Sequence, residues 1–364
     1  MIAILLNSLR SGGAERAMVN LGNALHARGM PVTLVLISSE GPLRQGIAPK
    51  IEMVELRARR AVAALPALVT WLRTTRPQVI LSACANSNVV AVLAVRLAGG
   101  AIRSVVCEQT TLSRVARDTH RLRHILVPYA ARWAYPRADA VVAVSEGVAQ
   151  DLGTALGLSR GRVSVIPNPL TPSITIDADR DLPHPWLRDR GAPVLLSVAR
   201  LTPAKDLQTL LRGFARLRGT REVRLVILGD GEERARLQRL VNQLGLSADV
   251  DIAGFAANPY PTMAAAGALV LSSQREGLPT VLMEALTLGT PVVATDCLNG
   301  PREILDGGRW GRLVPTGDPE ALAQAMDAAL DDVRPPPPRE ILRRYSVDVV
   351  AQRYLELLDP GVHA

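Results

Sequence analysis

Short apolar runs alternate with amphipathic stretches along the first half of the chain. An apolar run between turn signals is typical of a buried strand, and apolar positions repeated at helical spacing are typical of a helix. The stretch Ala17–Arg28 has the helical spacing and closes at Gly29. This alternation predicts a parallel sheet wrapped by helices. The strands that we expect are Ile2–Asn7, Val32–Ile37, Val79–Ser82, Arg103–Cys107 and Ala140–Ser145.

The same alternation restarts in the second half, after a break at Pro167-Asn168-Pro169. Residues Thr171–Pro193 are rich in Pro and Asp and have little periodicity, which predicts a linker. The prolines of Pro335–Pro338 end the second pattern, and we expect a last helix over Val347–Leu358 to pack back on the first domain. The strands expected here are Val194–Val198, Arg224–Leu228, Val250–Ala253, Ala268–Ser272 and Pro291–Thr295.

Together the two patterns predict an α/β chain with two facing Rossmann-like domains. We expect the first domain over residues 1–168, the second over 169–345, and a crossover helix and tail over 346–364. At roughly 100–200 residues per domain, the chain is long enough for two. Ligands of such sheets bind at the carboxyl ends of the strands, near the point where the strand order reverses, so two facing sheets would form a cleft.

Composition narrows the possible functions. The chain is 48% hydrophobic but only 3% aromatic, so the cores must consist mainly of Ala, Val and Leu. Scarce aromatic residues argue against base stacking and hence against nucleic acid as a partner. The three cysteines, Cys84, Cys107 and Cys297, are widely spaced and form no Cys-x-x-Cys, so we interpret them as buried reduced thiols. No signal peptide and no membrane-spanning run is expected, which favours a cytoplasmic location.

Charge is spread unevenly along the sequence. Residues 1–168 contain 20 Lys and Arg against 9 Asp and Glu, whereas residues 169–364 contain 22 against 25. The first half is therefore strongly basic and the second slightly acidic. This asymmetry predicts an anionic partner for the first half only: phosphate groups, nucleic acid or an anionic lipid surface.

The strongest chemical signal is the segment from Ser272 to Ala285. A strand is expected to end at Ser272, and a polar loop and Gly277-Leu278-Pro279 lead into a helix. Proline suits a first helical position because its missing N–H would have no partner there. The free N–H groups around Leu278, Pro279, Thr280 and Val281 then form an anion site suited to a diphosphate.

Two carboxylates, Glu276 and Glu284, flank this expected helix start at a spacing of eight residues. Carboxylates accept hydrogen bonds and so suit sugar hydroxyls. The alternative is that Glu276 is an acid favoured by the helix dipole and Glu284 a surface charge. The apolar neighbours of Glu284, Leu282 and Ala285 among them, weaken that alternative because a solvated face would not be so apolar.

Two cations, Arg200 and Lys205, follow the first strand of the second half. Positive charge at the carboxyl end of a strand can neutralise a diphosphate leaving group without a metal. The alternative is a pair of ordinary loop cations. The chain contains 40 Arg and only two Lys, Lys50 and Lys205, and this bias favours a specific need for an ammonium at position 205.

Glu276 and Glu284, with the residues between them, resemble the Glu-x7-Glu signature of family-4 retaining glycosyltransferases. The stretch Gly289–Asp296, Gly300-Pro301, and Gly311–Val314 continue that family's pattern. The resemblance covers nearly the whole chain and implies the glycosyltransferase-B fold, with a nucleotide-sugar donor bound mainly by the second domain. It implies that Glu276 contacts the donor sugar and Glu284 the ribose hydroxyls.

The same resemblance assigns further donor contacts. It places Arg200 and Lys205 on the donor phosphates, with Lys205, Arg200 and Glu276 as the catalytic residues. Gly229, in Gly229-Asp230-Gly231, resembles the family's Gly-x-Gly turn, and Gly254-Phe255 follows the strand where the backbone meets the base. The start Ser11–Arg16 resembles that of members that build lipid-linked or surface saccharides; its Gly12 and Gly13 would then lie under the diphosphate.

Acceptor contacts are expected at the strand that ends in Glu108. Related enzymes often have Glu-His here, whereas this chain has Gln109 after Glu108, so a histidine base is not expected at this position. His120 is a second acceptor candidate, and its alternative is a surface residue. The stretch Arg114–Arg137 mixes arginines with Leu, Ile, Trp and Tyr, which suits either an anionic membrane surface or a helix packed on the core.

The function that follows is a retaining, metal-independent glycosyltransferase. Its donor is a nucleotide-sugar, with uridine the expected base, and its acceptor is a saccharide or lipid-linked saccharide in glycan synthesis. We expect no cofactor, no metal site, and peripheral attachment at the inner face of a membrane. Two rivals are a nucleotide-sugar epimerase of the same architecture and a non-catalytic nucleotide-binding module.

Overall fold

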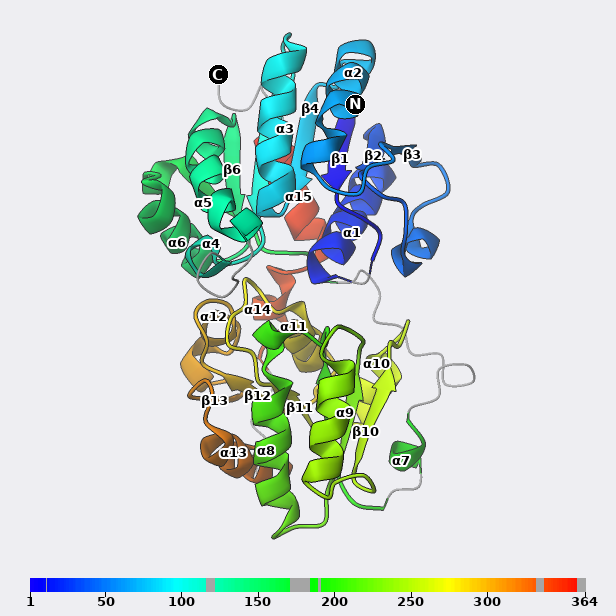
Figure 1. Ribbon diagram of the computed structural model, residues 1–364, viewed down its shortest axis with the longest axis vertical. Coiled ribbons are helices and arrows are strands. Elements are labelled where there is room, and N and C mark those ends of the chain that lie inside the picture. Colours follow the sequence, from blue (N-terminus) through cyan, green and yellow to red (C-terminus); the bar gives the residue numbers. More distant parts are fainter. Residues whose placement is uncertain (11, 116–121, 171–183, 189–190, 332–336, 359–364) are drawn as a thin grey trace. The chain divides into compact units, whose positions relative to one another are not determined.

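The computed structural model describes all residues except 11, 116–121, 171–183, 189–190, 332–336 and 359–364. It divides into two compact units (Figure 1). Unit 1 consists of residues Met1–Pro172 and Arg343–Ala364, and unit 2 of residues Ser173–Leu342. Unit 1 is therefore built from two separate stretches of the chain.

Unit 1 is a parallel sheet covered by helices. The strand order is β3-β2-β1-β4-β5-β6-β7, so the order reverses between β1 and β4. Its strands are β1 (Ile2–Leu6), β2 (Val32–Leu36), β3 (Glu52–Glu55), β4 (Val79–Ala83), β5 (Arg103–Glu108), β6 (Ala140–Ala143) and β7 (Val163–Val165). Its helices are α1 (Gly13–Ala27), α2 (Leu65–Thr75), α3 (Ala85–Ala98), α4 (Leu112–Val115), α5 (Leu122–Ala134), α6 (Glu146–Leu156) and α15 (Val347–Leu358).

Unit 2 repeats this plan with a six-stranded sheet in the order β10-β9-β8-β11-β12-β13. Its strands are β8 (Val194–Val198), β9 (Arg224–Leu228), β10 (Val250–Gly254), β11 (Ala268–Leu271), β12 (Val292–Thr295) and β13 (Arg312–Val314). Its helices are α7 (Pro185–Arg188), α8 (Leu207–Arg218), α9 (Arg234–Gln243), α10 (Tyr260–Ala265), α11 (Thr280–Thr287), α12 (Pro301–Ile304) and α13 (Pro319–Asp331), and α14 (Arg339–Arg343) crosses the boundary. The order reverses between β8 and β11.

The pairing of β8 with β11 stops early. The two strands pair only through Ala268 with Leu195 and Leu269 with Leu196, whereas β8 pairs with β9 along its full length. The carboxyl ends of β8 and β11 therefore separate at the switch point. In sheets of this type, that separation forms the crevice where ligands bind.

The expected crossover helix is confirmed. Helix α15 packs on α1 and buries Val350, Ala351, Tyr354 and Leu358 in unit 1. The buried cores consist mostly of Leu, Val, Ala and Ile, as the composition predicts.

Several local expectations need correction. Helix α1 begins at Gly13, four residues before the predicted start, and the short helix α7 lies within the stretch predicted to be a linker. Most of the rest of that stretch lies outside the described residues. Cys107 and Cys297 are buried free thiols as expected, but Cys84 is only half-buried. The short strands β3, β7 and β13 were not predicted.

Candidate active site

The loop that follows β8 carries the two predicted cations. Arg200 lies two residues beyond the strand and is exposed. Lys205 closes a turn of 3-10 helix over Pro203–Lys205, and its side chain is 21% exposed. The carboxyl end of β8 therefore presents one exposed and one partly buried positive charge.

The loop that follows β11 brings a carboxylate to the partly buried cation, Lys205. Lys205 Nζ lies 2.5 Å from Glu276 Oε1, although the two residues are 71 positions apart in sequence. Ser273 Oγ donates a hydrogen bond of 2.6 Å to the same oxygen. The Glu276 side chain is 10% exposed, so this ion pair is well shielded from water. Two of the three predicted catalytic residues thus meet at the switch point of unit 2.

Helix α11 begins beside this pair, one residue later than predicted. Pro279 is the N-cap residue, with φ −72° and ψ 95°, and the first helical residue is Thr280. Pro279 is not the first helical residue because its ψ of 95° is extended and not helical. The amide of Leu282 is already bonded to the Pro279 carbonyl, so the amides that open the helix are those of Thr280 and Val281. Both residues are half-buried.

Glu284 lies inside this helix and is 6% exposed. Its burial confirms the interpretation of its apolar neighbours, and it excludes an ordinary solvated surface charge. A carboxylate at this depth is costly unless it has polar partners.

The loop after β12 supports the turn at Gly277-Leu278-Pro279. Gly300 has φ +86°, and a Cβ on this residue would lie 2.5 Å from Pro279 Cδ and 2.9 Å from the Gly277 carbonyl oxygen. Arg275 and Leu298 form a parallel bridge between the same two loops. The entry into α11 is therefore held by close backbone packing.

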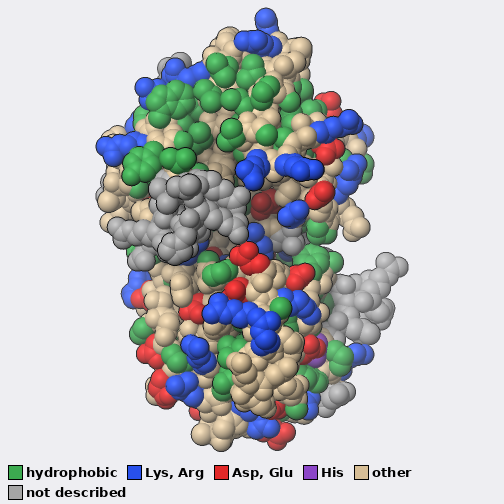
Figure 2. Space-filling view, in the orientation of Figure 1, with side chains coloured by type: hydrophobic (Ala, Val, Ile, Leu, Met, Phe, Trp, Pro, Cys, Tyr) green, Lys and Arg blue, Asp and Glu red, His purple; other side chains and the backbone are tan. Residues whose placement is uncertain are grey.

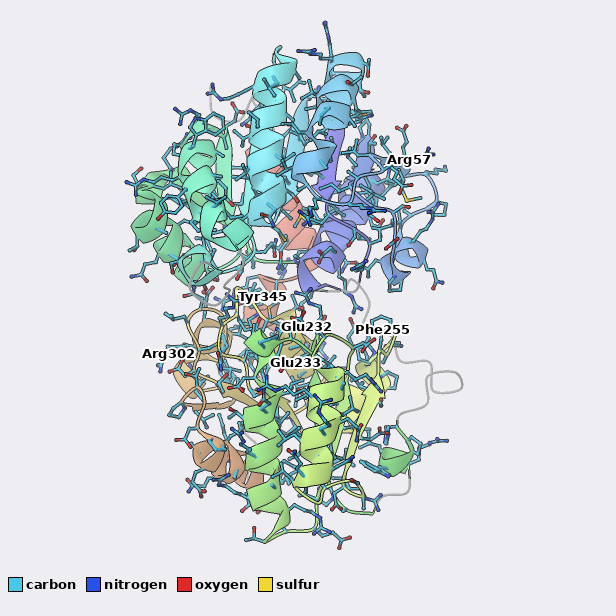
Figure 3. All side chains as sticks on the ribbon, in the orientation of Figure 1. Arg57, Glu232, Glu233, Phe255, Arg302 and Tyr345 are labelled. Carbon is cyan, nitrogen blue, oxygen red and sulfur yellow. The ribbon has the colours of Figure 1, made fainter. Side chains whose placement is uncertain are left out.

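Gly229 and Phe255 follow β9 and β10 along the same edge of the sheet. Gly229 has φ +147°, and a Cβ there would lie 1.8 Å from the Ala199 carbonyl oxygen. Packing against the loop after β8 therefore demands glycine at this position whether or not a ligand approaches it. Phe255 is 44% exposed, and Figure 3 shows it with Glu232, Glu233 and Arg302 at this edge of unit 2.

The first glycines of the chain lie in unit 1. Gly12 is the N-cap residue of α1, and Gly13 is its first residue. A Cβ on Gly12 would lie 2.0 Å from a carboxylate oxygen of Glu15, whereas one on Gly13 would meet nothing within 4 Å. The side chain of Glu15 therefore lies beside this helix start.

Glu108 is the most buried of the candidates. It is 0% exposed, and Tyr135 donates to its Oε2 at 2.5 Å, while the amides of Gln109 and Thr110 donate to its Oε1 at 3.0 and 3.2 Å. Burial raises the pKa of the Glu108 carboxyl from 4.5 to about 7, against the effect of these hydrogen bonds. The structure thus gives Glu108 a role within unit 1, and its acceptor role stays a prediction. His120 lies outside the described residues.

Four residues around the Lys205–Glu276 pair were missed by sequence reasoning. Ser273 bonds to Glu276, and Asp206 and Gln274 bond to each other across the two loops. The spacing Ser273-x-x-Glu276 was a readable signal, since a hydroxyl three residues before an acid often bonds locally. Cys297 is buried nearby; burial, followed by the charge of Glu276, raises its thiol pKa to about 12. No sequence pattern marks it.

The described residues contain no group of three or more His, Cys, Asp or Glu side chains placed to hold a metal ion. None of the described helices has the length and apolar character needed to cross a membrane.

Comparison with known proteins gives the family. Residues 11–173 match the family described as Glycosyltransferase Family 4, and residues 179–346 match Glycosyl transferases group 1. The lipopolysaccharide core biosynthesis glycosyltransferase LpsE of Rhizobium meliloti is 30% identical over 363 residues, which is 96% of this chain and 96% of that protein. The chain belongs to glycosyltransferase family 4.

Similarity to other known glycosyltransferases is consistent with membership of family 4. An N-acetylgalactosaminyltransferase of Campylobacter jejuni that acts on a diphospho-undecaprenol saccharide is 28% identical, covering 91% of this chain and 90% of that protein. Anabaena HepE in complex with UDP-glucose has a TM-score of 0.81 at 22% identity, covering 98% of each chain. WaaG, a glycosyltransferase of lipopolysaccharide biosynthesis, has a TM-score of 0.75 at 18% identity, covering 99% of this chain and all of that one. The fold is therefore the glycosyltransferase-B fold, as predicted.

Proposed function

We propose that this family-4 glycosyltransferase moves a sugar from a UDP-sugar to a saccharide or lipid-linked saccharide, with retention of configuration and without a metal. The observation that carries the proposal is the Lys205–Glu276 pair at the switch point of unit 2. The loop that holds Lys205 also carries exposed Arg200, and α11 begins four residues after Glu276. Related proteins support the choice of substrates: HepE has been solved with UDP and with UDP-glucose, and relatives take part in lipopolysaccharide core biosynthesis or act on a lipid diphosphate.

In this mechanism the bond between the sugar and the diphosphate breaks first. Negative charge then builds on the leaving phosphate, where Arg200, Lys205 and the amides that open α11 stabilise it. Glu276 holds the donor sugar and Glu284 the ribose. The acceptor attacks from the face that the phosphate leaves, and the phosphate takes the acceptor's proton, so that the mechanism needs no protein nucleophile.

A thermal-shift experiment tests the donor site. The purified protein is heated with UDP, GDP, ADP or NAD, each with and without EDTA, alongside Glu284→Gln. We expect UDP alone to raise the Tm, an effect that EDTA leaves intact and that Glu284→Gln loses because an amide is a poorer partner for hydroxyl donors. Glu222→Gln, which alters an exposed carboxylate of unit 2, is the matched control.

Each other outcome has a definite meaning. A rise with NAD alone would favour the epimerase, and a rise that needs a divalent ion would refute metal independence. No rise with any nucleotide would remove the donor site from the proposal.

We further propose that unit 1 meets an anionic membrane at the inner face, where a lipid-linked acceptor would lie. Leu126, Tyr129 and Trp133 of α5 are 63%, 72% and 40% exposed, and their spacing puts them on one face of the helix. The Arg137 guanidinium stacks on the Trp133 ring, with 4.9 Å from its carbon to the ring centroid. Figure 2 shows hydrophobic side chains gathered on unit 1 where Figure 1 draws α3 and α5. Aromatic residues next to arginines suit an anionic headgroup region.

Vesicle co-sedimentation tests this surface. We expect more binding to vesicles with anionic lipid than to neutral ones, and loss of binding in the double variant Leu126→Ser, Tyr129→Ser. Val62→Ser, which changes an exposed valine of unit 1 outside α3 and α5, is the control. Equal binding to both vesicle types, or no effect of the double variant, would refute the membrane surface.

A further inference from the structure

The loops that follow β8 and β11 are hydrogen-bonded to each other next to the Lys205–Glu276 pair. The backbone N–H of Gln274 donates to the Ala204 carbonyl at 2.9 Å, and its side-chain Nε2 donates to Asp206 Oδ2 at 3.1 Å. Ser272 Oγ donates to the Lys205 carbonyl at 2.8 Å. Gln274 thus bonds to the residues on both sides of Lys205, and it lies two residues before Glu276.

Asp206 has an unusual backbone conformation. Its φ of 45° and ψ of 45° are left-handed, a conformation that non-glycine residues rarely adopt. The side chain stabilises it locally: Asp206 Oδ1 accepts from the Thr209 amide at 3.4 Å and Oδ2 from Thr209 Oγ1 at 2.8 Å, which caps α8. The chain therefore turns sharply directly after Lys205, and the direction of that turn depends on Asp206.

We propose that Asp206 and Gln274 form a latch that positions Lys205 against Glu276. Neither residue is proposed to touch the substrate, so both are positioning residues for the pair, and the inference rests on the proposed donor site. A lysine ammonium on a flexible stem reaches a carboxylate at 2.5 Å reproducibly only if both backbones are fixed to within about half an ångström. The crevice is where β8 and β11 have stopped pairing, so the latch replaces the missing strand hydrogen bonds.

A helix cap alone would explain Asp206 but not Gln274. Gln274 is exposed, and its side chain reaches across to the other loop. Gln274→Glu places a carboxylate opposite the Asp206 carboxylate and repels it, while the cap on Thr209 remains available. Adding Asp206→Asn restores the bond with donor and acceptor exchanged, since the asparagine amide donates to the new carboxylate and its carbonyl still accepts from Thr209.

The experiment compares wild type, Gln274→Glu, the double variant Asp206→Asn, Gln274→Glu, and Gln238→Glu. The last is a matched control in α9, where Gln238 donates to the neighbouring Asn242. Binding of UDP and of uridine is measured by ligand-observed NMR, and Tm is measured without ligand. We expect Gln274→Glu to weaken UDP binding about tenfold with uridine binding and Tm unchanged, and the double variant and the control to bind UDP as wild type does.

Hydrogen exchange of residues 203–206 and 273–276 tests the latch in the ligand-free protein, where no nucleotide-sugar donor is bound. Faster exchange in Gln274→Glu that returns to the wild-type rate in the double variant is the expected result. Unchanged exchange, an unchanged UDP affinity, or equal loss of UDP and uridine binding together with a lower Tm would overturn the latch. If wild type binds no UDP, the proposed donor site fails, and the exchange result still decides whether the loops are latched.

Discussion

At the scale of single residues, Glu108 shows how burial changes the pKa of a carboxyl group. Tyr135, which holds one carboxylate oxygen, accepts in turn from Asn88, and Asn88 accepts from Ser82 at 2.8 Å. The chain of bonds runs from β4 through α3 to the end of β5 and lies inside unit 1. A carboxyl in such a place favours its protonated form, because ionisation would leave a charge without water.

This arrangement predicts a pH dependence of stability. The pKa of Glu108 is about 7 in the folded protein and 4.5 in an unfolded chain, so the unfolded state loses this proton first. Stability of unit 1 should therefore fall as pH rises from about 4.5 to about 7, by roughly 3 kcal/mol. Urea unfolding between pH 5 and pH 8 should show a smaller decline in Glu108→Gln than in wild type.

The matched control for this prediction is Glu40→Gln, an exposed carboxylate of unit 1 that pairs with Arg10. It should keep the wild-type slope. Parallel pH profiles for wild type and Glu108→Gln would show that Glu108 is ionised in the folded protein at neutral pH.

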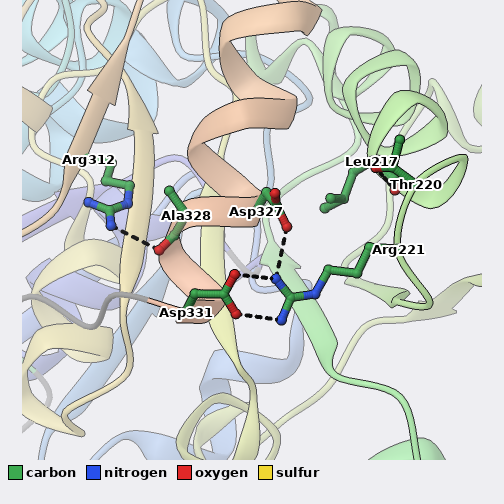
Figure 4. Close-up of polar contacts among 7 residues, drawn as sticks. All are labelled: Leu217, Thr220, Arg221, Arg312, Asp327, Ala328 and Asp331. Atoms are coloured by element: carbon green, nitrogen blue, oxygen red, sulfur yellow. Dashed lines mark hydrogen bonds and ion pairs between the residues drawn. The ribbon is translucent and has the colours of Figure 1, made fainter.

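At the scale of elements, α13 is fastened to its neighbours from two sides (Figure 4). Arg221, just after α8, donates from Nη1 to Asp327 and from both terminal nitrogens to Asp331, each at 2.8 Å. The hydrogen bond to Asp331 raises the pKa of Arg221 and lowers that of Asp331. Arg312 of β13 donates to the Ala328 carbonyl at 2.9 Å. Helix α13 is thereby tied to α8 and to the edge strand.

Arg221→Lys tests whether the shape of the guanidinium matters here. Lysine keeps the charge but cannot form the forked pair, so we expect the Tm to fall by about 2 °C. Arg216→Lys is the control, because Arg216 joins the same two helices through one exposed pair with Glu320. Equal effects of the two variants would mean that only charge counts at this position.

Elements also show what the sequence could and could not predict. Strands β8 and β9 follow the predicted bounds because each is a buried apolar run between turns. Strand β3 was missed because it is a mostly exposed edge strand with Glu at both ends, and β7 and β13 have only three residues each. Short edge strands bury too little to leave an apolar pattern.

The sequence could suggest candidate residues for the site but not the contacts between them. Lys205 and Glu276 were identified separately, each in a segment that follows a strand. Their pairing depends on β8 lying next to β11, and sequence spacing carries no information on that order. The roles of Asp206 and Gln274 depend on the same neighbourhood, so they became visible only in the structure.

At the scale of the whole molecule, unit 1 depends on a helix that follows unit 2 in sequence. Tyr354 of α15 is 1% exposed and its hydroxyl lies 3.4 Å from Cys107 Sγ in β5. Arg353 donates to the Val165 carbonyl at 2.6 Å, and Arg28, the C-cap residue of α1, pairs with Asp348. Helix α15 therefore joins α1, β5 and β7.

Tyr354→Ala should destabilise unit 1 alone. Removing a buried aromatic ring costs roughly 3–5 kcal/mol. Hydrogen exchange should become faster in α1 and β5 and stay unchanged in α8 of unit 2. Gln352→Ala, an exposed change on the same helix, should leave all three unaffected. Faster exchange in both units would show that they unfold together.

The discontinuity of unit 1 has a consequence for synthesis of the chain. A ribosome makes residues 1–172, then all of unit 2, and only then the segment that contains α15. Domains usually fold in the order in which they are made. Here the continuous unit 2 is complete while the nascent unit 1 still exposes the apolar side of α1 that α15 later covers. During translation, this surface is where we expect chaperones to bind, and the waiting time grows with any insertion into unit 2.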